Sequence, residues 1–244
     1  MTLKLSELAI HIPASIQLFE KYDFNYYQNG NKTFKEACKE KGLVFSEIDA
    51  ELSRLQHNSK DSSSLTLEDM SIDRLIDFIN GQYHSNETEN LSLIQFDIQN
   101  LISDASCEKP LLSLLINVEN KFIELKEKLS QHCDKEDKIL FPQMRKLFEL
   151  RRDKSETHPS KAISLIKKSI QVLEAEHIDA SNILSEIKNM TNKFAIPLNA
   201  PKHYKTLMES LKEFESGLHV HLHIENNILF PKIIALEEEL NIRS

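Results

Sequence analysis

Four long segments with helical apolar periodicity dominate this chain and constrain its fold more than any other feature. Apolar side chains recur every three or four residues through the segments 71–102, 111–150, 160–193 and 202–240. The joins between these segments are short and lie at 103–110, 152–159 and 194–201. Long helices with short joins lie antiparallel to their neighbours in the chain. The pattern therefore predicts an all-α fold built on an up-down-up-down four-helix bundle.

Composition agrees with a helical fold and narrows the classes of partner. The 244 residues include only 4 Gly and 7 Pro, which disfavours an all-β fold. A net charge of −8 argues against binding to nucleic acid or to an anionic membrane. No apolar run reaches the ~20 residues that span a bilayer, and the N-terminus lacks the apolar core of a signal peptide. Three scattered cysteines (Cys38, Cys107 and Cys133) are typical of a reducing compartment, so we expect a cytoplasmic protein.

A smaller helical unit is expected ahead of the bundle. Its helix start and stop signals are a cap at Ser6, a break at Pro13, a cap at Thr33, a terminating Gly42 and a cap at Ser46. The stretch that follows is polar and Ser-rich, as linkers are. We predict a small N-terminal helical domain at 1–57, a linker at 58–70 and the bundle at 71–244.

The second and fourth segments contain nearly the same phrase, and this repeat points to the chemistry. The first copy reads His132-Cys-Asp-Lys-Glu136-Asp-Lys-Ile-Leu-Phe-Pro142. The second copy follows 89 residues later and reads His221-Leu-His-Ile-Glu225-Asn-Asn-Ile-Leu-Phe-Pro231. Residues four apart lie on one face of a helix, so the imidazole and the carboxylate of each copy can hold the same metal ion or adjacent ions.

Two further histidines complete a candidate ligand set. His84 on the first segment precedes His132 by 48 residues, and His177 on the third precedes His221 by 44. Imidazole and carboxylate together suit iron, manganese or zinc rather than copper(I). Two carboxylates that can bridge favour two metal ions, whose excess positive charge attracts an anionic or electron-rich ligand. The predicted metal ligands are His84, His132, Glu136, His177, His221 and Glu225.

The prolines that end both copies predict a local irregularity. Pro142 and Pro231 each follow the Glu by six residues inside a helical pattern. Proline in a helix interior costs about 3 kcal/mol or more. A matched pair therefore indicates a matched kink beside the site.

Other residues near the phrase are expected to have lesser roles. His219 and His223 lie about 200° around the helix from His221, which predicts exposed positions or contacts behind the ligands. Cys133 is expected to be a small packing residue. Packing and solvation are the expected roles of Tyr83 and Glu176, although both could line an access path. Surface positions are expected for the remaining histidines, His11, His57, His158 and His203.

The ligand pattern resembles that of the hemerythrin-like di-iron proteins and, more narrowly, of the RIC family, which repairs iron–sulfur centres. The resemblance covers nearly the whole chain, because residues 6–38 match the family's short N-terminal domain. It implies two non-haem iron ions with an oxo or hydroxo bridge, with Glu136 and Glu225 as bridging carboxylates. Ferritin-like bundles use E-x-x-H instead. The chain departs from the family at Tyr26–Tyr27, where adjacent cysteines are typical, so the role of the N-terminal domain is open.

The resemblance implies protection or repair of iron–sulfur clusters damaged by nitrosative or oxidative stress. Two mechanisms are compatible with it: enzymatic reduction of NO to nitrous oxide, and delivery of iron to a damaged cluster. An alternative is a non-enzymatic protein that binds or senses O2 or NO, and a third is a purely structural bundle. The expected partners are NO or O2 and damaged iron–sulfur proteins, with no nucleic acid and no membrane. A homodimer is compatible with these expectations.

Overall fold

A computed structural model describes residues 3–58, 66–104, 109–153 and 160–242. Within these ranges the regular elements are helical and none is a strand; the antiparallel pairing of Lys4 with Thr33 is an isolated bridge. None of the described helices is both long enough and apolar enough to span a membrane. The chain divides into two compact units, one of Met1–Leu75 with His219–Ala235 and the other of Ile76–Leu218 with Leu236–Ser244.

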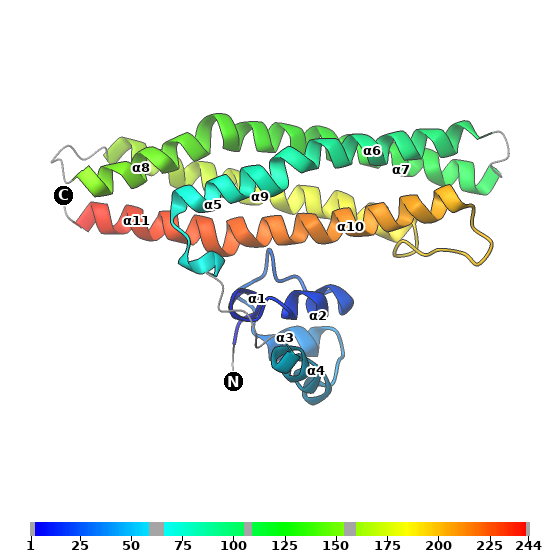
Figure 1. The fold of residues 1–244 in the computed structure, drawn as a ribbon, viewed down its shortest axis with the longest axis horizontal. Coiled ribbons are helices and arrows are strands. Elements are labelled where there is room, and N and C mark those ends of the chain that lie inside the picture. Colours follow the sequence, from blue (N-terminus) through cyan, green and yellow to red (C-terminus); the bar gives the residue numbers. More distant parts are fainter. Residues whose placement is uncertain (1–2, 59–65, 105–108, 154–159, 243–244) are drawn as a thin grey trace. The chain divides into compact units, whose positions relative to one another are not determined.

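Four long helical segments, drawn from cyan to red in Figure 1, confirm the predicted bundle. We call each segment a helical line, because most of them consist of several helical elements that follow one another end to end. The first line consists of α5 (Ile72–Ile79), η2 (Asn80–His84) and α6 (Ser85–Ser103). The second consists of α7 (Lys109–Lys135), η3 (Glu136–Leu140) and α8 (Phe141–Asp153). The third is α9 (Ser160–Met190), and the fourth consists of α10 (Lys202–Ile224), η4 (Glu225–Leu229) and α11 (Phe230–Ile242). Three of the four lines are therefore interrupted by a π-helical turn.

The larger unit is held together by the apolar stripes that the periodicity predicts. On α7 the buried side chains are Leu115, Val118, Phe122, Leu125 and Leu129. The Phe122 ring contacts that of Phe214 on α10, with centroids 6.3 Å apart. Fully burying one such side chain stabilises the fold by about 1.5–3 kcal/mol, so these stripes fix the helices that carry the candidate ligands.

The third line ends at Met190, three residues before the predicted end. Asn192, Lys193 and Phe194 have φ values of 49°, 60° and 56°. Three successive residues in the left-handed region cannot continue a right-handed helix. The Thr191 hydroxyl oxygen accepts a hydrogen bond from the Phe194 amide at 3.3 Å, which stabilises the turn.

Short helices make up the N-terminal part of the smaller unit: α1 (Leu5–His11), α2 (Ser15–Lys21), α3 (Phe34–Glu40), α4 (Phe45–Asn58) and η1 (Leu67–Asp69). Thr33 caps α3 as predicted, and Gly42 follows α3 with φ 66°. The predicted cap at Ser6 is wrong, because Ser6 lies inside α1. Its hydroxyl donates to the Gly30 carbonyl at 2.9 Å, so it serves the loop that packs against α1 rather than the helix end.

The predicted domain division stays a prediction. Residues 59–65 of the proposed linker lie outside the described residues. The smaller unit also includes His219–Ala235, which contains the second copy of the repeated phrase. The N-terminal helices and this copy are therefore parts of one compact unit.

Candidate metal centre

In the larger unit, one buried carboxylate oxygen faces two imidazoles. Glu136 is the first residue of η3, and its side chain is fully buried. Its Oε2 lies 3.3 Å from Nε2 of His132, one turn earlier on α7, and 3.3 Å from Nε2 of His84 at the end of η2. The i, i+4 spacing of the first copy thus places its two side chains together, as predicted.

His177 on α9 brings a third imidazole to the same place. Its Nε2 lies 2.9 Å from Nε2 of His132, and both side chains are buried. The two ring nitrogens face one another at hydrogen-bond distance, and the ring planes are inclined by 62°. Converging imidazole nitrogens in a buried position are the arrangement that a metal ion requires.

The second copy repeats this geometry on the fourth line. Nε2 of His221 lies 3.0 Å from Oε1 of Glu225, and the residues are 2% and 0% exposed. Glu225 begins η4, just as Glu136 begins η3. The repeated phrase therefore produces two equivalent His/Glu pairs.

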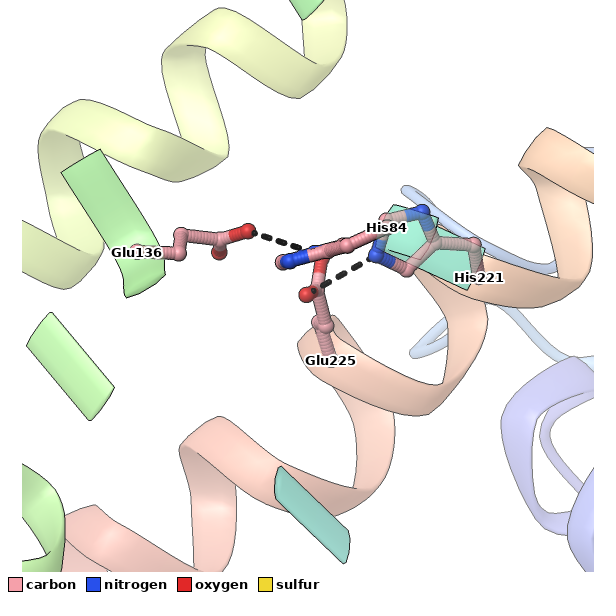
Figure 2. Close-up of side chains that lie close together, drawn as sticks. All are labelled: His84, Glu136, His221 and Glu225. Atoms are coloured by element: carbon pink, nitrogen blue, oxygen red, sulfur yellow. Dashed lines mark hydrogen bonds and ion pairs between the residues drawn. The ribbon is translucent and has the colours of Figure 1, made fainter. Parts of the chain in front are cut away.

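The six predicted ligands form two overlapping groups, in each of which the donor atoms lie within 4.8 Å of one another. His84, Glu136, His221 and Glu225 form the first group, which Figure 2 shows, and His132, Glu136, His177 and Glu225 form the second. Both carboxylates belong to both groups. Two fully buried carboxylates are costly unless a cation compensates them, and the imidazole and carboxylate donors suit iron. The residues present therefore fit a metal site.

The predicted irregularity beside each proline takes the form of a π turn at the Glu. The Phe141 amide donates to the Glu136 carbonyl and the Phe230 amide to the Glu225 carbonyl, both across five residues. Pro142 and Pro231 come next and have no N–H to donate, so a widened turn accommodates them where a regular helix would lose a hydrogen bond. A third π turn ends at His84. π turns thus position three of the six candidate ligands.

Two carboxylates hold the outer nitrogens of the histidines. Asp137 Oδ1 lies 2.8 Å from Nδ1 of His84, and Glu176 Oε2 lies 3.1 Å from Nδ1 of His132. The His132 bond, with help from Lys135, lowers the pKa of Glu176 from 4.5 to about 2. Such carboxylates fix the orientation of a ligating imidazole and raise its basicity.

Sequence reasoning missed both of these roles. For Glu176 the sequence predicts packing and solvation, or a place along an access path, yet its carboxylate reaches His132 on another helix. Asp137 follows Glu136 directly, and an acidic residue at that position of the phrase is the signal that could have identified it.

For the histidines that flank His221, the sequence predicts either exposed positions or contacts behind the ligands. Both side chains are buried, so the exposed alternative is wrong. His219 is 8% exposed and pairs with Glu20 at 2.9 Å. His223 is 3% exposed, and burial lowers its pKa to about 4. His219 contacts Glu20 on α2, and His223 contacts the ring of Tyr26 in the loop that follows α2; no local sequence pattern indicates either contact.

The other residues singled out take varied positions. Cys133 is half-buried and donates weakly to Glu87 Oε2 at 3.9 Å, and it lines a cavity rather than packing tightly. Tyr83 packs against Phe78 with ring centroids 6.1 Å apart. His11, His57 and His203 are exposed as predicted. Cys107 and His158 lie outside the described residues.

Comparison with known proteins identifies similar chains. Residues 96–233 match the hemerythrin HHE cation-binding domain. A probable iron–sulfur cluster repair protein of Haemophilus influenzae is 30% identical over 95% of this chain and 96% of its own. Iron–sulfur cluster repair proteins YtfE of Escherichia coli O81 and of Escherichia fergusonii are each 32% identical, over 96% of this chain and 97% of their own.

Proposed function

Because this chain belongs to the hemerythrin-like iron–sulfur cluster repair family, we propose that it holds two iron ions and acts on iron–sulfur clusters damaged by nitrosative or oxidative stress. The observation that carries the proposal is the presence of both buried carboxylates in both groups of ligand atoms. A carboxylate has two oxygens and can contact two ions, so Glu136 and Glu225 would each contribute to both ion sites.

The proposed ligands divide between the ions by geometry. His84 and His221 would hold one ion, and His132 and His177 the other, with the two glutamates common to both. Asp137 and Glu176 would keep the imidazoles of His84 and His132 oriented for binding. Burial of the whole set excludes bulk water and strengthens each electrostatic contact.

Reduction of NO to nitrous oxide is the first mechanism that such a centre would support. Two bound ferrous ions would supply two electrons, which with two protons convert two NO molecules into one nitrous oxide and one water. The chain would contribute ligands of fixed geometry and a site closed to bulk solvent. Delivery of iron to a damaged cluster is the second mechanism, and for it the ferrous ions are cargo.

Metal content is the first test. Protein purified without added metal, or reconstituted anaerobically with Fe2+, should contain about two irons per chain, one for each group of ligands. The double variant His132→Ala/Glu136→Ala should lose most of this iron, whereas the exposed His203→Ala should keep it. Zinc alone, or no metal after reconstitution, would overturn the proposal.

Gas analysis separates the mechanisms and the alternative function. Anaerobically reduced protein mixed with NO should release one nitrous oxide for every two NO consumed. Reversible binding of NO without nitrous oxide would support the binding or sensing alternative. Rapid loss of iron to an apo iron–sulfur protein, again without nitrous oxide, would support iron delivery.

A further inference from the structure

Ion pairs bridge the solvent-exposed seam between α7 and α9. Three lysines of α7, spaced seven residues apart, each reach an acidic residue of α9. The pairs are Lys121 with Glu186 at 2.8 Å, Lys128 with Asp179 at 3.3 Å, and Lys135 with Glu176. Residue numbers rise along α7 as they fall along α9, so the two helices are antiparallel. The seam is therefore a row of paired charges as far as Lys135.

Beyond Lys135 the seam becomes aliphatic. Positions seven apart share one face of a helix, and the position seven before Asp179 on α9 is Val172, where Glu186 and Asp179 would predict a third acid. On the second line, Ile139 lies four residues after Lys135. Val172 is 55% exposed and Ile139 is 53% exposed. Two exposed aliphatic side chains thus take the place of the next ion pair.

These side chains border an open groove of about 250 Å³ in the larger unit. The lining residues are Lys135, Ile139 and Leu140 of the second line and Lys168, Ser169, Val172 and Leu173 of α9. Leu140 and Leu173 are only 1% and 3% exposed, so they form the floor. Because the helices are antiparallel, Lys135 and Lys168 lie at opposite ends. The groove is therefore apolar, with a lysine at each end.

The charge of this groove is opposite to that of the whole chain. Both charged lining residues are lysines, whereas the chain has a net charge of −8. Lys135 is paired with Glu176. Lys168 is exposed and forms no ion pair with any residue that the structure describes. An acidic partner, which the net charge of the chain repels, is attracted at this place.

The size of the groove favours a side chain of another protein over a free small molecule. Small-molecule sites are clefts of about 300–1,000 Å³ that enclose most of the ligand. The groove is smaller, and its volume equals that of about eight waters in the liquid. This volume accommodates one or two aliphatic side chains that are presented by a larger partner.

We propose that this groove docks a segment of a partner protein that combines aliphatic side chains with carboxylates. The aliphatic side chains would lie on Leu140 and Leu173, and a carboxylate would pair with Lys168. The groove adjoins the metal centre, because Leu140 ends the π turn that Glu136 begins. A docked partner would therefore lie beside a candidate ligand. That this partner is a damaged iron–sulfur protein rests on the proposed function, whereas docking itself requires no iron.

A peptide titration tests the docking. The protein as purified is titrated into the fluorescein-labelled peptide Glu-Leu-Leu-Glu-Glu-Leu-Leu-Glu with an amidated C-terminus, and fluorescence anisotropy gives the dissociation constant. The same peptide with glutamine in place of every glutamate should bind at least about threefold more weakly. Binding should also weaken at about 1 M salt, where the screening length falls to about 3 Å.

Two substitutions locate the binding site. Val172→Glu completes the acidic row and should weaken peptide binding at least about tenfold, because it removes an aliphatic wall and repels the carboxylates of the peptide. Lys168→Glu should weaken it at least about fivefold. The matched controls are Val44→Glu, at a valine that is 56% exposed in the smaller unit, and Lys212→Glu, at an exposed lysine of α10. Both controls should bind the peptide normally.

Three results would overturn the proposal. The first is normal affinity in both groove variants, and the second is equal binding of the glutamine peptide. The third is a dimer in sedimentation analysis that Val172→Glu dissociates, because the groove would then belong to a second copy of this chain. Iron-free protein that still binds the peptide would count against the proposed function alone.

Discussion

Replacing Glu176 with Gln should weaken metal binding about tenfold while leaving the fold intact. Glu176 lies outside both groups of ligand atoms, yet its Oε2 lies 3.1 Å from Nδ1 of His132. Its other oxygen accepts a hydrogen bond from the Lys135 ammonium group. Gln has the same shape and can still accept from Nδ1, so the change removes the charge that favours a basic, correctly oriented imidazole.

The size of the effect follows from the pKa of Glu176. The hydrogen bond with His132 and the one with Lys135 lower this pKa from 4.5 to about 2, a difference that corresponds to about 3 kcal/mol. Lys135 is 46% exposed, so its screened contribution is about 0–1 kcal/mol. About 2–3 kcal/mol then remains, and solvent screening of the Glu176 carboxylate, which is 28% exposed, reduces this to about 1–2 kcal/mol for the contact with His132, which is about a 5- to 30-fold change in affinity.

The assay is an anaerobic competition for Fe2+ between the protein and a coloured chelator. Glu176→Gln should bind iron about tenfold more weakly than the unaltered protein. Lys135→Met leaves the carboxylate on His132 and should change the affinity by no more than about threefold. Affinity within twofold of normal for Glu176→Gln, or an equal loss in Lys135→Met, would refute this reasoning.

The same contact predicts a pH dependence in the metal-free protein. A carboxyl group whose pKa is lowered by folding stabilises the fold above its unfolded pKa, and the stabilisation is lost as the pH falls through the folded pKa. The free energy of unfolding of the unaltered protein should therefore exceed that of Glu176→Gln by a constant amount above about pH 5. This difference should disappear as the pH falls from 4.5 to about 2. Denaturant unfolding at several pH values measures it, and an advantage that persists at pH 2 would contradict the assignment.

Three further predictions test other parts of the structure. Gly30→Ala should destabilise the protein by about 1–3 kcal/mol in denaturant unfolding, because the added Cβ would meet Asn227 and Ser6. Gly217→Ala, where no atom lies within 4 Å of the added Cβ, should stabilise the protein by about 0.5–1 kcal/mol. Equal effects of the two substitutions would contradict the close approach of the loop at Gly30. Asp137→Asn should weaken iron binding by about tenfold or more in the chelator assay, and unchanged affinity would remove its orienting role. Because burial lowers the pKa of His223 from 6.5 to about 4, the unaltered protein should lose stability as the pH falls from 6.5 to 4, and His223→Gln should lose less; parallel pH curves would exclude this.

Local patterns explain most of what could be predicted at the site. The i, i+4 pairs His132/Glu136 and His221/Glu225 follow from helix geometry, which is a property of neighbouring residues in one chain segment. His84 and His177 could be proposed because each precedes one copy of the repeated phrase by a similar distance, 48 and 44 residues. Pro142 indicated a local irregularity, although its form as a π turn depends on hydrogen bonds that the sequence does not specify.

Contacts between distant segments could not be predicted in this way. Glu176 on α9 reaches His132 on α7, and His219 pairs with Glu20, which lies 199 residues earlier in the chain. Each of these partners is an ordinary polar residue in its own segment. Only the packing of one helix on another decides which acidic side chain faces an imidazole and which faces water.

The sequence by itself determined the helical lines, the duplicated His/Glu pairs and the chemistry of the donor set, because periodicity and spacing act along a single helix. Only the tertiary structure decided which contacts the equivalent residues of the two copies make, and therefore which roles they have. Asp137 of the first copy orients His84 beside an open cavity, whereas Asn226 of the second copy fastens the loop of the N-terminal domain. The physical reason is that burial and hydrogen bonding depend on what a face packs against, and two faces of similar sequence acquire different roles once only one of them is covered.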